Sequence, residues 1–372
     1  METDQASGGA IADFISSNGL SGPGLLPEQL REFTLTNMRA RRIGRFNAHA
    51  SLRELKASEG EKVIAVDMGG DKLAASYFMV RDGVLVQAGG DLLACQGDGG
   101  AGYLAALEKL GERASRELVP VGISFAGPVD GTRLIAAPNL PDFLAEFRER
   151  YGSDFARLFP AVQVANDAVA GLMAGAVEAA RRYPGACDVI YLINGSGLGG
   201  AVLASETVYA AEPGHVRIIG QLNPLGQAKA CGLDGARYTC VEAVAASKAG
   251  VEDLWQQRTR DRLPGRAISA RCQAGDALAR SLYDNSARIT AHAVRGMADA
   301  FGLTEDRRLV VVAHGGIFHV PGYGDRVMDI FGKEPGPRPS FLFTREFSSN
   351  MCLSGAAIAA TNVLRRTAGT AR

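Results

Sequence analysis

The chain has 372 residues, of which 47% are hydrophobic and 22% charged, as expected for a globular protein of two domains with sizeable cores. Its 40 basic and 40 acidic residues cancel, so its charge indicates no nucleic-acid partner and no membrane surface. No apolar run approaches the roughly 18 residues of a membrane span, and the N-terminus lacks the basic and apolar regions of a secretory signal. The six cysteines are scattered, which favours reduced thiols or metal ligands in a cytoplasmic protein.

Residues 1–60 are predicted to form an N-terminal extension. They are rich in Gly, Ser and Ala, continue into an arginine-bearing segment over 39–45, and have a short expected helix over 52–56. Their low apolar content favours a segment that is partly disordered or packs on the following domain. The alternative, a DNA-binding helix-turn-helix, lacks a clear pair of amphipathic helices joined by a short turn.

The first strong motif joins two strands through a glycine turn. An apolar run over 63–66 ends at Asp67, Gly69 and Gly70 allow the chain to reverse, and a second strand is predicted over 73–80. Such a turn presents backbone N–H groups to an anion, beside the charge of Lys72. Asp67 could hold a hydrated Mg²⁺ ion, which favours oxygen ligands. The alternative is an ordinary glycine hairpin with a solvated carboxylate.

A helix over 103–118, a strand from 121 and an exposed helix over 144–151 are predicted next. A short strand from 162 then ends in Asn166 and Asp167, followed by a helix rich in small residues over 168–181. A carboxylate at a strand end beside a helix start is well placed to face a cleft. The alternative is a helix N-cap, for which Asn and Asp are preferred.

The strand–glycine turn–strand pattern occurs again in the second half, with strands over 189–193 and 201–209 around the turn 194–200. Two such units indicate an internal duplication. The turn satisfies G-x-G-x-x-G, but a strand follows it instead of a helix, and the expected acidic residue about 20 positions later is missing. A Rossmann site is therefore excluded, and so is a P-loop, because its motif does not occur.

Further polar and glycine motifs follow along the second half. Residues 211–216 form a polar cluster, a helix is expected to begin at Val241, and long helical stretches cover 274–301. A buried strand is predicted from residue 309, and the pair Gly315 and Gly316 follows it. The small residues of 354–360 predict a helix that can pack closely on a neighbour.

Together these motifs resemble the ROK family of sugar kinases and regulators, within the actin/hexokinase ATPase superfamily, from about residue 63 to 360. The matching segments are the first phosphate motif at Asp67 to Gly70, the Gly-Pro turn at Phe125 to Asp130, Pro138 to Leu140, the Asn-Asp pair at 166–167, the second phosphate motif at Gly195 to Gly200, Glu212 to His215, Cys240 to Glu242, and Gly315-Gly316. The resemblance implies an α/β fold of two RNase H-like (actin/hexokinase-type) domains with mixed sheets around a central cleft. We place them at 61–187 and 188–372, with the last helix returning to the first domain.

The resemblance also implies a function: ATP-dependent phosphorylation of a hydroxyl of a hexose or a hexose-like polyol such as glucose, an amino sugar or a C7-cyclitol, by a homodimer. Asp167 would be the general base. Asn139, Asn166, Glu212, His215 and Glu242 would bind the substrate. Asp67, Gly69, Gly70, Lys72, Gly195, Ser196, Gly197, Gly315 and Gly316 would bind ATP, with Mg²⁺ held at Asp67 through water. The alternative function is a sugar-sensing ROK transcriptional regulator or a non-catalytic sugar-binding protein.

Two positions depart from the family pattern. Asp71 stands where the family usually has Thr, and its carboxylate would repel phosphate unless it binds the metal or turns away. The family's zinc site is represented by His215, Cys231 and Cys240, one cysteine short of the usual set, whereas structural zinc takes four ligands. Either Zn²⁺ is bound there, or the site holds two buried thiols, with His215 serving the sugar.

Overall fold

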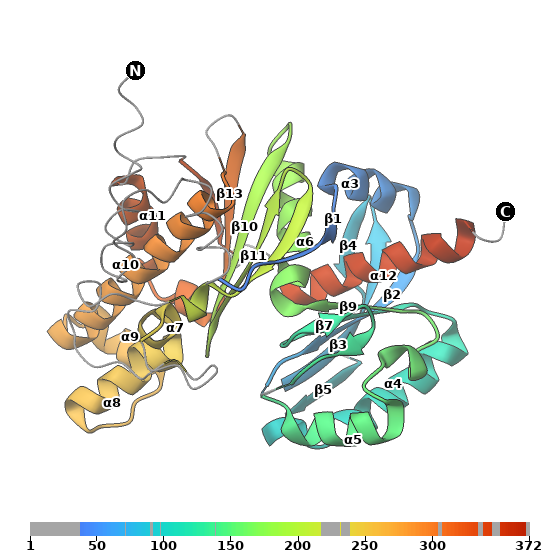
Figure 1. Ribbon diagram of the computed structural model, residues 1–372, viewed down its shortest axis with the longest axis horizontal. Helices are drawn as coiled ribbons and strands as arrows, with labels where there is room; N and C mark the ends of the chain where they lie inside the picture. The colour runs from blue at the N-terminus through green and yellow to red at the C-terminus, as the bar shows by residue number, and fades with distance from the viewer. Residues whose placement is uncertain are drawn as a thin grey trace, which may run out of the picture. The chain divides into compact units, whose positions relative to one another are not determined.

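The computed structural model describes residues 38–70, 72–89, 92–96, 98–137, 139–216, 231, 239–303, 307–333, 338–343 and 350–369, and Figure 1 traces their elements. Residues 1–37 of the predicted extension, Asp71 and Pro138 lie outside this set. The chain forms two compact units, Arg45–Gly185 with Phe347–Arg372, and Met1–Gly44 with Ala186–Glu346; they are called the first and second unit below. The limits 61–187 and 188–372 stay a prediction.

The first unit contains a mixed sheet in the order β4-β3-β2-β6-β9, with β5 also paired to β3. The strands are β2 (Lys62–Met68), β3 (Lys72–Arg81), β4 (Val84–Gln87), β5 (Leu93–Gln96), β6 (Val121–Phe125) and β9 (Val162–Asn166). β2 pairs antiparallel with β3 and parallel with β6, which in turn is parallel to β9. Met68, Phe125 and Asn166 are in register, so the carboxyl ends of three strands share one edge of the sheet.

Both faces of this sheet are covered, which explains why β2 is a continuous apolar run. Ile64, Val66 and Met68 share a core with α4 (Tyr103–Glu117), whereas Val63 and Ala65 share one with α12 (Met351–Gly369). α12 contacts β2, β6, β9 and α6 (Asp167–Arg182), and runs across these strands in Figure 1. The remaining elements of the unit are α3 (Ala48–Ala57), η1 (Asp98–Gly100), β7 (Val129–Asp130), β8 (Arg133–Leu134), α5 (Pro141–Tyr151) and η2 (Phe155–Arg157).

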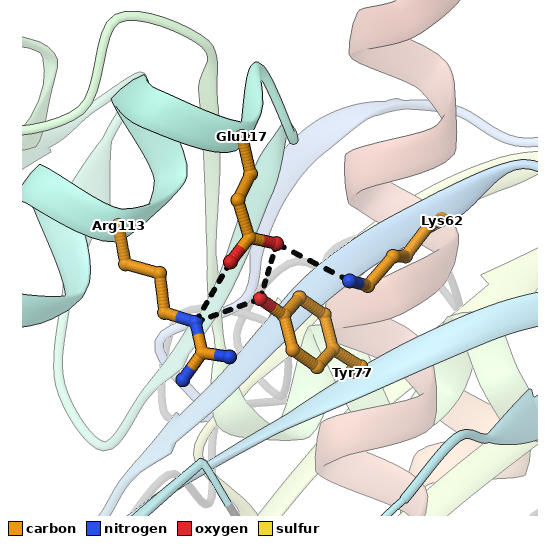
Figure 2. A network of polar contacts seen from close by, with 4 residues as sticks. All are labelled: Lys62, Tyr77, Arg113 and Glu117. Atoms are coloured by element: carbon orange, nitrogen blue, oxygen red, sulfur yellow. Dashed lines mark hydrogen bonds and ion pairs between the residues drawn. The ribbon is translucent and has the colours of Figure 1, made fainter.

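A network of hydrogen bonds and ion pairs links the end of α4 to the sheet (Figure 2). The hydroxyl of Tyr77 on β3 donates to Glu117, Arg113 donates to Glu117 at 2.9 Å and to Tyr77 at 2.8 Å, and Lys62 reaches Glu117 at 3.2 Å. The Lys62 ammonium also lies 3.4 Å from the centroid of the Tyr77 ring. The hydrogen bond from Tyr77, reinforced by both cations, lowers the pKa of Glu117 to about 2.

The second unit contains the sheet β1-β12-β11-β10-β13-β14. Its strands are β1 (Arg41–Arg45), β10 (Cys187–Asn194), β11 (Leu198–Ala204), β12 (Thr207–Ala211), β13 (Arg308–His314) and β14 (Ser340–Phe343). β10 pairs antiparallel with β11 and parallel with β13, as β2 pairs with β3 and β6 in the first unit. The same arrangement thus occurs in both units, in agreement with the duplication predicted from the glycine turns.

Helices cover the second sheet around a core centred on α10 (Ala277–Ala300), which contacts α7 (Val241–Ala245), α9 (Gly265–Gln273) and α11 (Tyr323–Lys333). The other elements are η3 (Pro213–His215), the π-helical segment η5 (Ser247–Asp253), α8 (Leu254–Thr259) and η6 (Gly316–His319). None of the helices in the described ranges is long and apolar enough to span a membrane.

Two predicted elements have different bounds in the structure. The strand expected over 201–209 is a hairpin, β11 and β12, because Ser205 and Glu206 adopt positive φ angles of 46° and 65°. Two consecutive positive φ values form the turn that matches the twist of paired strands, and no glycine marks it. The helical stretch expected over 274–301 begins only after Gly275 (φ 91°), where the side chain of Asp276 caps α10 by accepting from the N–H of Ala279.

Candidate active site

Two carboxylates lie at the carboxyl edge of the first sheet. Asp67, near the end of β2, is 8% exposed. Its Oδ1 accepts from the hydroxyl of Ser124 and its Oδ2 from the amide of Asn350, both at 3.0 Å. Burial raises the pKa of Asp67 above its ordinary value, and the two donors and the charge of Lys72 oppose this rise. The hydrogen bonds hold the orientation of the carboxylate.

Asp167 is the first residue of α6 and follows β9 directly. Its Oδ1 accepts from the N–H of Ala168 at 2.8 Å. Loss of solvent around the half-buried side chain, helped by the negative charge of Asp67, raises the pKa of Asp167 to about 6. A carboxyl group with this pKa is ionised at neutral pH yet basic enough to accept a proton in a reaction.

The helix cap next to Asp167 is Asn166. Its Oδ1 accepts from the N–H groups of Ala168 at 3.0 Å and Val169 at 3.4 Å, and its Nδ2 donates to the carbonyl of Gly127 at 3.2 Å. Asn166 is therefore the N-cap of α6, the role that the sequence offered as an alternative for this pair of residues. One of its two amide hydrogens is used in the bond to Gly127.

The first glycine turn closes with a hydrogen bond from the N–H of Gly69 to the carbonyl of Lys72 at 2.9 Å. The side chain of Lys72 is exposed. Asn139, also exposed, lies beside this turn, since a Cβ added to Gly70 would be 3.1 Å from the Cβ of Asn139. The structure thus brings Asn139 together with the first glycine turn.

The second glycine turn lies at the end of β10 and closes with a bond from the N–H of Gly195 to the carbonyl of Gly197 at 2.9 Å. Ser196 is exposed, and a Cβ on Gly195 would meet nothing within 4 Å. Beneath the turn, Asn194 is fully buried and donates to the carbonyl of Ala245 at 3.0 Å. Asn194 therefore supports the backbone of the turn, and the space beside Gly195 is open.

The Gly315-Gly316 pair adjoins the same turn from β13. Gly315 has φ 114°, and a Cβ there would lie 1.9 Å from the carbonyl oxygen of Asn194. Only glycine fits this position. A Cβ on Gly316 would meet nothing within 4 Å. Gly315 thus serves the contact between the two turns, while Gly316 leaves its backbone open to a ligand.

The remaining predicted substrate residues gather in the second unit near η3 and α7. Glu242 lies in the first turn of α7 and accepts from the N–H of Leu198 at 2.9 Å. Glu212 immediately precedes η3, and His215 is its last residue. These three residues are half-buried.

His215 also belongs to a cluster with Cys231 and Cys240, in which the three potential ligand atoms lie within 4.8 Å of one another. The Sγ atom of Cys231 is 3.5 Å from Nδ1 of His215. Burial raises the pKa of the Cys240 thiol to about 12, so without a metal ion the thiol stays protonated. The family's further cysteine would align with either Lys229 or Leu233, and both positions lie outside the described residues. Between His215 and Cys240 the sequence has no other cysteine and one acidic residue, Asp234.

The sequence profile of the ROK family matches residues 63–362. The chain belongs to the ROK family. This range includes both glycine turns and both strand-end carboxylates. A comparison with curated proteins gives no significant match.

Solved ROK structures resemble this protein over nearly their whole length. The ROK hexokinase from Thermus thermophilus is 25% identical, with a TM-score of 0.60 over 82% of this chain and 99% of its own. A ROK glucokinase from Streptomyces griseus, solved with glucose and AMPPNP, is 22% identical, with a TM-score of 0.58 over 81% and 99%. A ROK transcriptional regulator, a homologue of the E. coli MLC protein, is 15% identical, with a TM-score of 0.57 over 96% and 94%. The predicted actin/hexokinase-type α/β fold of two domains is confirmed.

Sequence reasoning missed three residues that support the motifs of this ROK protein. Ser124 lies inside β6, Asn350 precedes α12, and Asn194, the first residue of the predicted turn, is the last residue of β10. The sequence assigned no role to any of these three side chains. A polar residue within an otherwise apolar strand, as at Ser124, was the available signal.

Proposed function

We propose that this ROK protein is an ATP-dependent kinase that phosphorylates a hydroxyl of a hexose or a hexose-like polyol. The observation that carries the proposal is Asp167, a carboxyl group at the end of β9 with its pKa raised to about 6. A sugar hydroxyl is a poor nucleophile, so its attack needs a base with a pKa near the working pH.

In the proposed reaction, the acceptor hydroxyl gives its proton to Asp167 as its oxygen attacks the γ-phosphorus. The bond between the γ-phosphorus and the bridging oxygen breaks, and ADP leaves with the electron pair. Asn139, Asn166, Glu212, His215 and Glu242 would fix the acceptor's hydroxyls. Sites of this kind reject analogues that lack a hydroxyl, because a buried polar partner is left unpaired.

The two glycine turns suit the phosphates of ATP. The space beside Gly195 and Gly316, where a Cβ would meet nothing within 4 Å, lets a ligand approach the backbone closely. Lys72 would supply positive charge near the first turn. The carboxylate of Asp67, held by two neutral donors, fits a water ligand of Mg²⁺. The ion, when bound, neutralises phosphate charge.

The histidine–cysteine cluster fits zinc in ligand type and convergence. We propose that His215, Cys231 and Cys240 hold a structural Zn²⁺ ion, with water able to supply the fourth ligand. Coordination would deprotonate the thiol of Cys240 and tie η3 to the start of α7. The zinc content of the purified protein measures occupancy directly, and a content well below one ion per chain would contradict the proposal.

The acceptor is left as a class: glucose, an amino sugar or a C7-cyclitol. The Streptomyces griseus glucokinase was solved with glucose, and another similar structure is described as an N-acetylmannosamine kinase, from Listeria monocytogenes. A homodimer forms part of the proposal, as the family resemblance implies.

The test is ADP release from ATP and Mg²⁺ with a panel of hexoses, amino sugars and cyclitols, for the wild type and Asp167→Asn. We expect turnover with one panel member and a loss of about 10² or more in the variant, as for removal of a general base. A variant as active as the wild type would contradict the role of Asp167.

A second candidate is a sugar-sensing regulator. The observation that favours it is the ROK regulator structure, whose similarity covers 96% of this chain, against 82% for the hexokinase. Under this alternative, calorimetry would detect sugar binding while no panel member is phosphorylated.

A further inference from the structure

Three segments of the second unit meet at one point. The N–H of Leu198, which ends the second glycine turn, donates to Oε2 of Glu242 at 2.9 Å. A Cβ on Gly197 would lie 2.7 Å from the same oxygen, and the three atoms nearest to it all belong to Glu242. A Cβ on Gly214, in η3, would lie 2.2 Å from the carbonyl oxygen of Leu198 and 3.2 Å from the Cβ of Glu242. The proposed acceptor residues and the phosphate turn are therefore in direct contact.

The segment that contains Glu242 is bonded to the turn at both of its ends. Glu242 binds Leu198 at the start of α7. Beyond the end of α7, the N–H of Ser247 lies 3.0 Å from the carbonyl oxygen of Gly195 and 3.2 Å from Oδ1 of Asn194. Asn194 in turn donates to the carbonyl of Ala245. A displacement of α7 would thus be transmitted to the turn, because these bonds are short and Asn194 is fully buried.

A carboxylate can serve two partners at once. It has two oxygens with about four acceptor sites, and Leu198 uses one of them. A hydrogen bond from a backbone N–H to an ionised carboxylate is roughly twice as strong as a neutral one. The remaining acceptor sites of Glu242 suit the hydroxyl of a sugar or cyclitol.

We propose that Glu242 is a positioning residue for the second phosphate turn, in addition to its proposed contact with the acceptor. Its carboxylate holds the N–H of Leu198, and thereby the backbone of Gly195 to Gly197 that would receive the nucleotide phosphates. Acceptor recognition and phosphate positioning then share one group, so the affinities for acceptor and nucleotide are coupled reciprocally. The inference rests on the proposed kinase function.

The first test measures nucleotide affinity without any acceptor, by calorimetry with AMPPNP and Mg²⁺. We expect Glu242→Ala to weaken binding about tenfold, since a charge-assisted hydrogen bond is lost. Glu242→Gln, which keeps a side-chain oxygen that can accept the hydrogen bond from Leu198, should retain most of the affinity.

Glu212→Gln is the matched control, because it removes another proposed contact with the phosphoryl acceptor but should leave nucleotide affinity unchanged. Unchanged affinity in Glu242→Ala would overturn the inference and leave the kinase proposal standing.

The second test is a double-mutant cycle with Gly197→Ala. In the wild type the new methyl group would displace the carboxylate of Glu242 and weaken nucleotide binding. In a Glu242→Ala background the obstacle is gone, so the same substitution should cost little more. Strongly non-additive losses are expected for groups in contact. Additive losses would show that Gly197 and Glu242 act independently, against the inference.

A third measurement separates this inference from the kinase proposal. Should the wild type bind no nucleotide, the kinase proposal fails, and hydrogen exchange over residues 194–200 decides the inference. Glu242→Ala should speed exchange of the Leu198 amide tenfold or more, relative to amides elsewhere in the same sheet. Equal exchange in both proteins would overturn the positioning role.

Discussion

Asp67, Asn166 and Asp167 lie within one strand-end region, yet each has different surroundings. Asn166 uses its side-chain oxygen to cap α6, and both oxygens of Asp67 accept from neutral side chains. Asp167 accepts from the N–H of Ala168 and has its pKa raised to about 6 by burial and by the charge of Asp67. The residue types alone would not have shown that Asn166 caps the helix and that the pKa of Asp167 is raised. A carboxyl group becomes a base near neutral pH only through its surroundings.

The raised pKa of Asp167 predicts the pH dependence of the proposed kinase reaction. As its proposed general base, Asp167 must be ionised, so kcat/KM should be constant above about pH 6 and fall tenfold per unit below it. A profile between pH 4.5 and 8.5 with the best acceptor measures this, with pH-jump controls for stability. A falling limb centred near pH 4, the ordinary range of Asp, would show that burial does not raise the pKa of the working base.

At the scale of elements, the end of α4 shows how a surface network responds to pH. The pKa of Glu117 is lowered to about 2, so its stabilising effect is present above the unfolded value of about 4.5. That effect is lost as the pH falls from 4.5 towards 2, because the carboxyl group then binds a proton in the folded state as well.

Glu117→Gln is therefore expected to lower the urea midpoint of unfolding at pH 7, with a difference from the wild type that shrinks below pH 4.5. Glu112→Gln is the control, because Glu112 is exposed on the same helix and outside this network. A difference that stays constant between pH 7 and pH 3.5 would contradict the contribution of the Glu117 charge.

Element boundaries illustrate what local pattern can and cannot predict. The turn at Asp82 and Gly83 has the Asp-Gly sequence typical of a two-residue hairpin turn, and its φ angles are positive, at 52° and 69°. The equivalent turn at Ser205 and Glu206 also has two positive φ angles but no glycine. Pairing of β11 with β12, set by their register, imposes the turn there.

At the scale of the whole molecule, the chain returns to its first unit through α12. α12 lies close to β6 and α6 at two glycines. A Cβ on Gly122 of β6 would lie 1.8 Å from the carbonyl oxygen of Ala356 in α12, and a Cβ on Gly355 of α12 would lie 1.8 Å from the carbonyl oxygen of Ala170 in α6. The small residues of this helix, noted in the sequence, permit this contact. Asn350, which binds Asp67, directly precedes it.

Gly355→Ala is accordingly expected to destabilise the protein by at least 1–3 kcal/mol, the usual range for overpacking, because backbone lies where the methyl group would go. Gly332→Ala on α11 is the matched control. Its Cβ would meet nothing within 4 Å, so the higher helix propensity of Ala should stabilise by about 0.5–1 kcal/mol. Denaturant unfolding measures both changes, and a neutral Gly355→Ala would contradict the close packing of α12.

The sequence by itself determined the two glycine turns, the carboxylates at the strand ends, the continuous apolar run of β2, and the family. These are local patterns, set by backbone freedom at glycine and by the period of apolar residues. Only the tertiary structure decided that Ser124 and Asn350 hold Asp67, that Glu242 accepts from the second glycine turn, and that burial raises the pKa of Asp167 to about 6. Each depends on residues distant in sequence and on the water that folding removes, neither of which a local pattern contains.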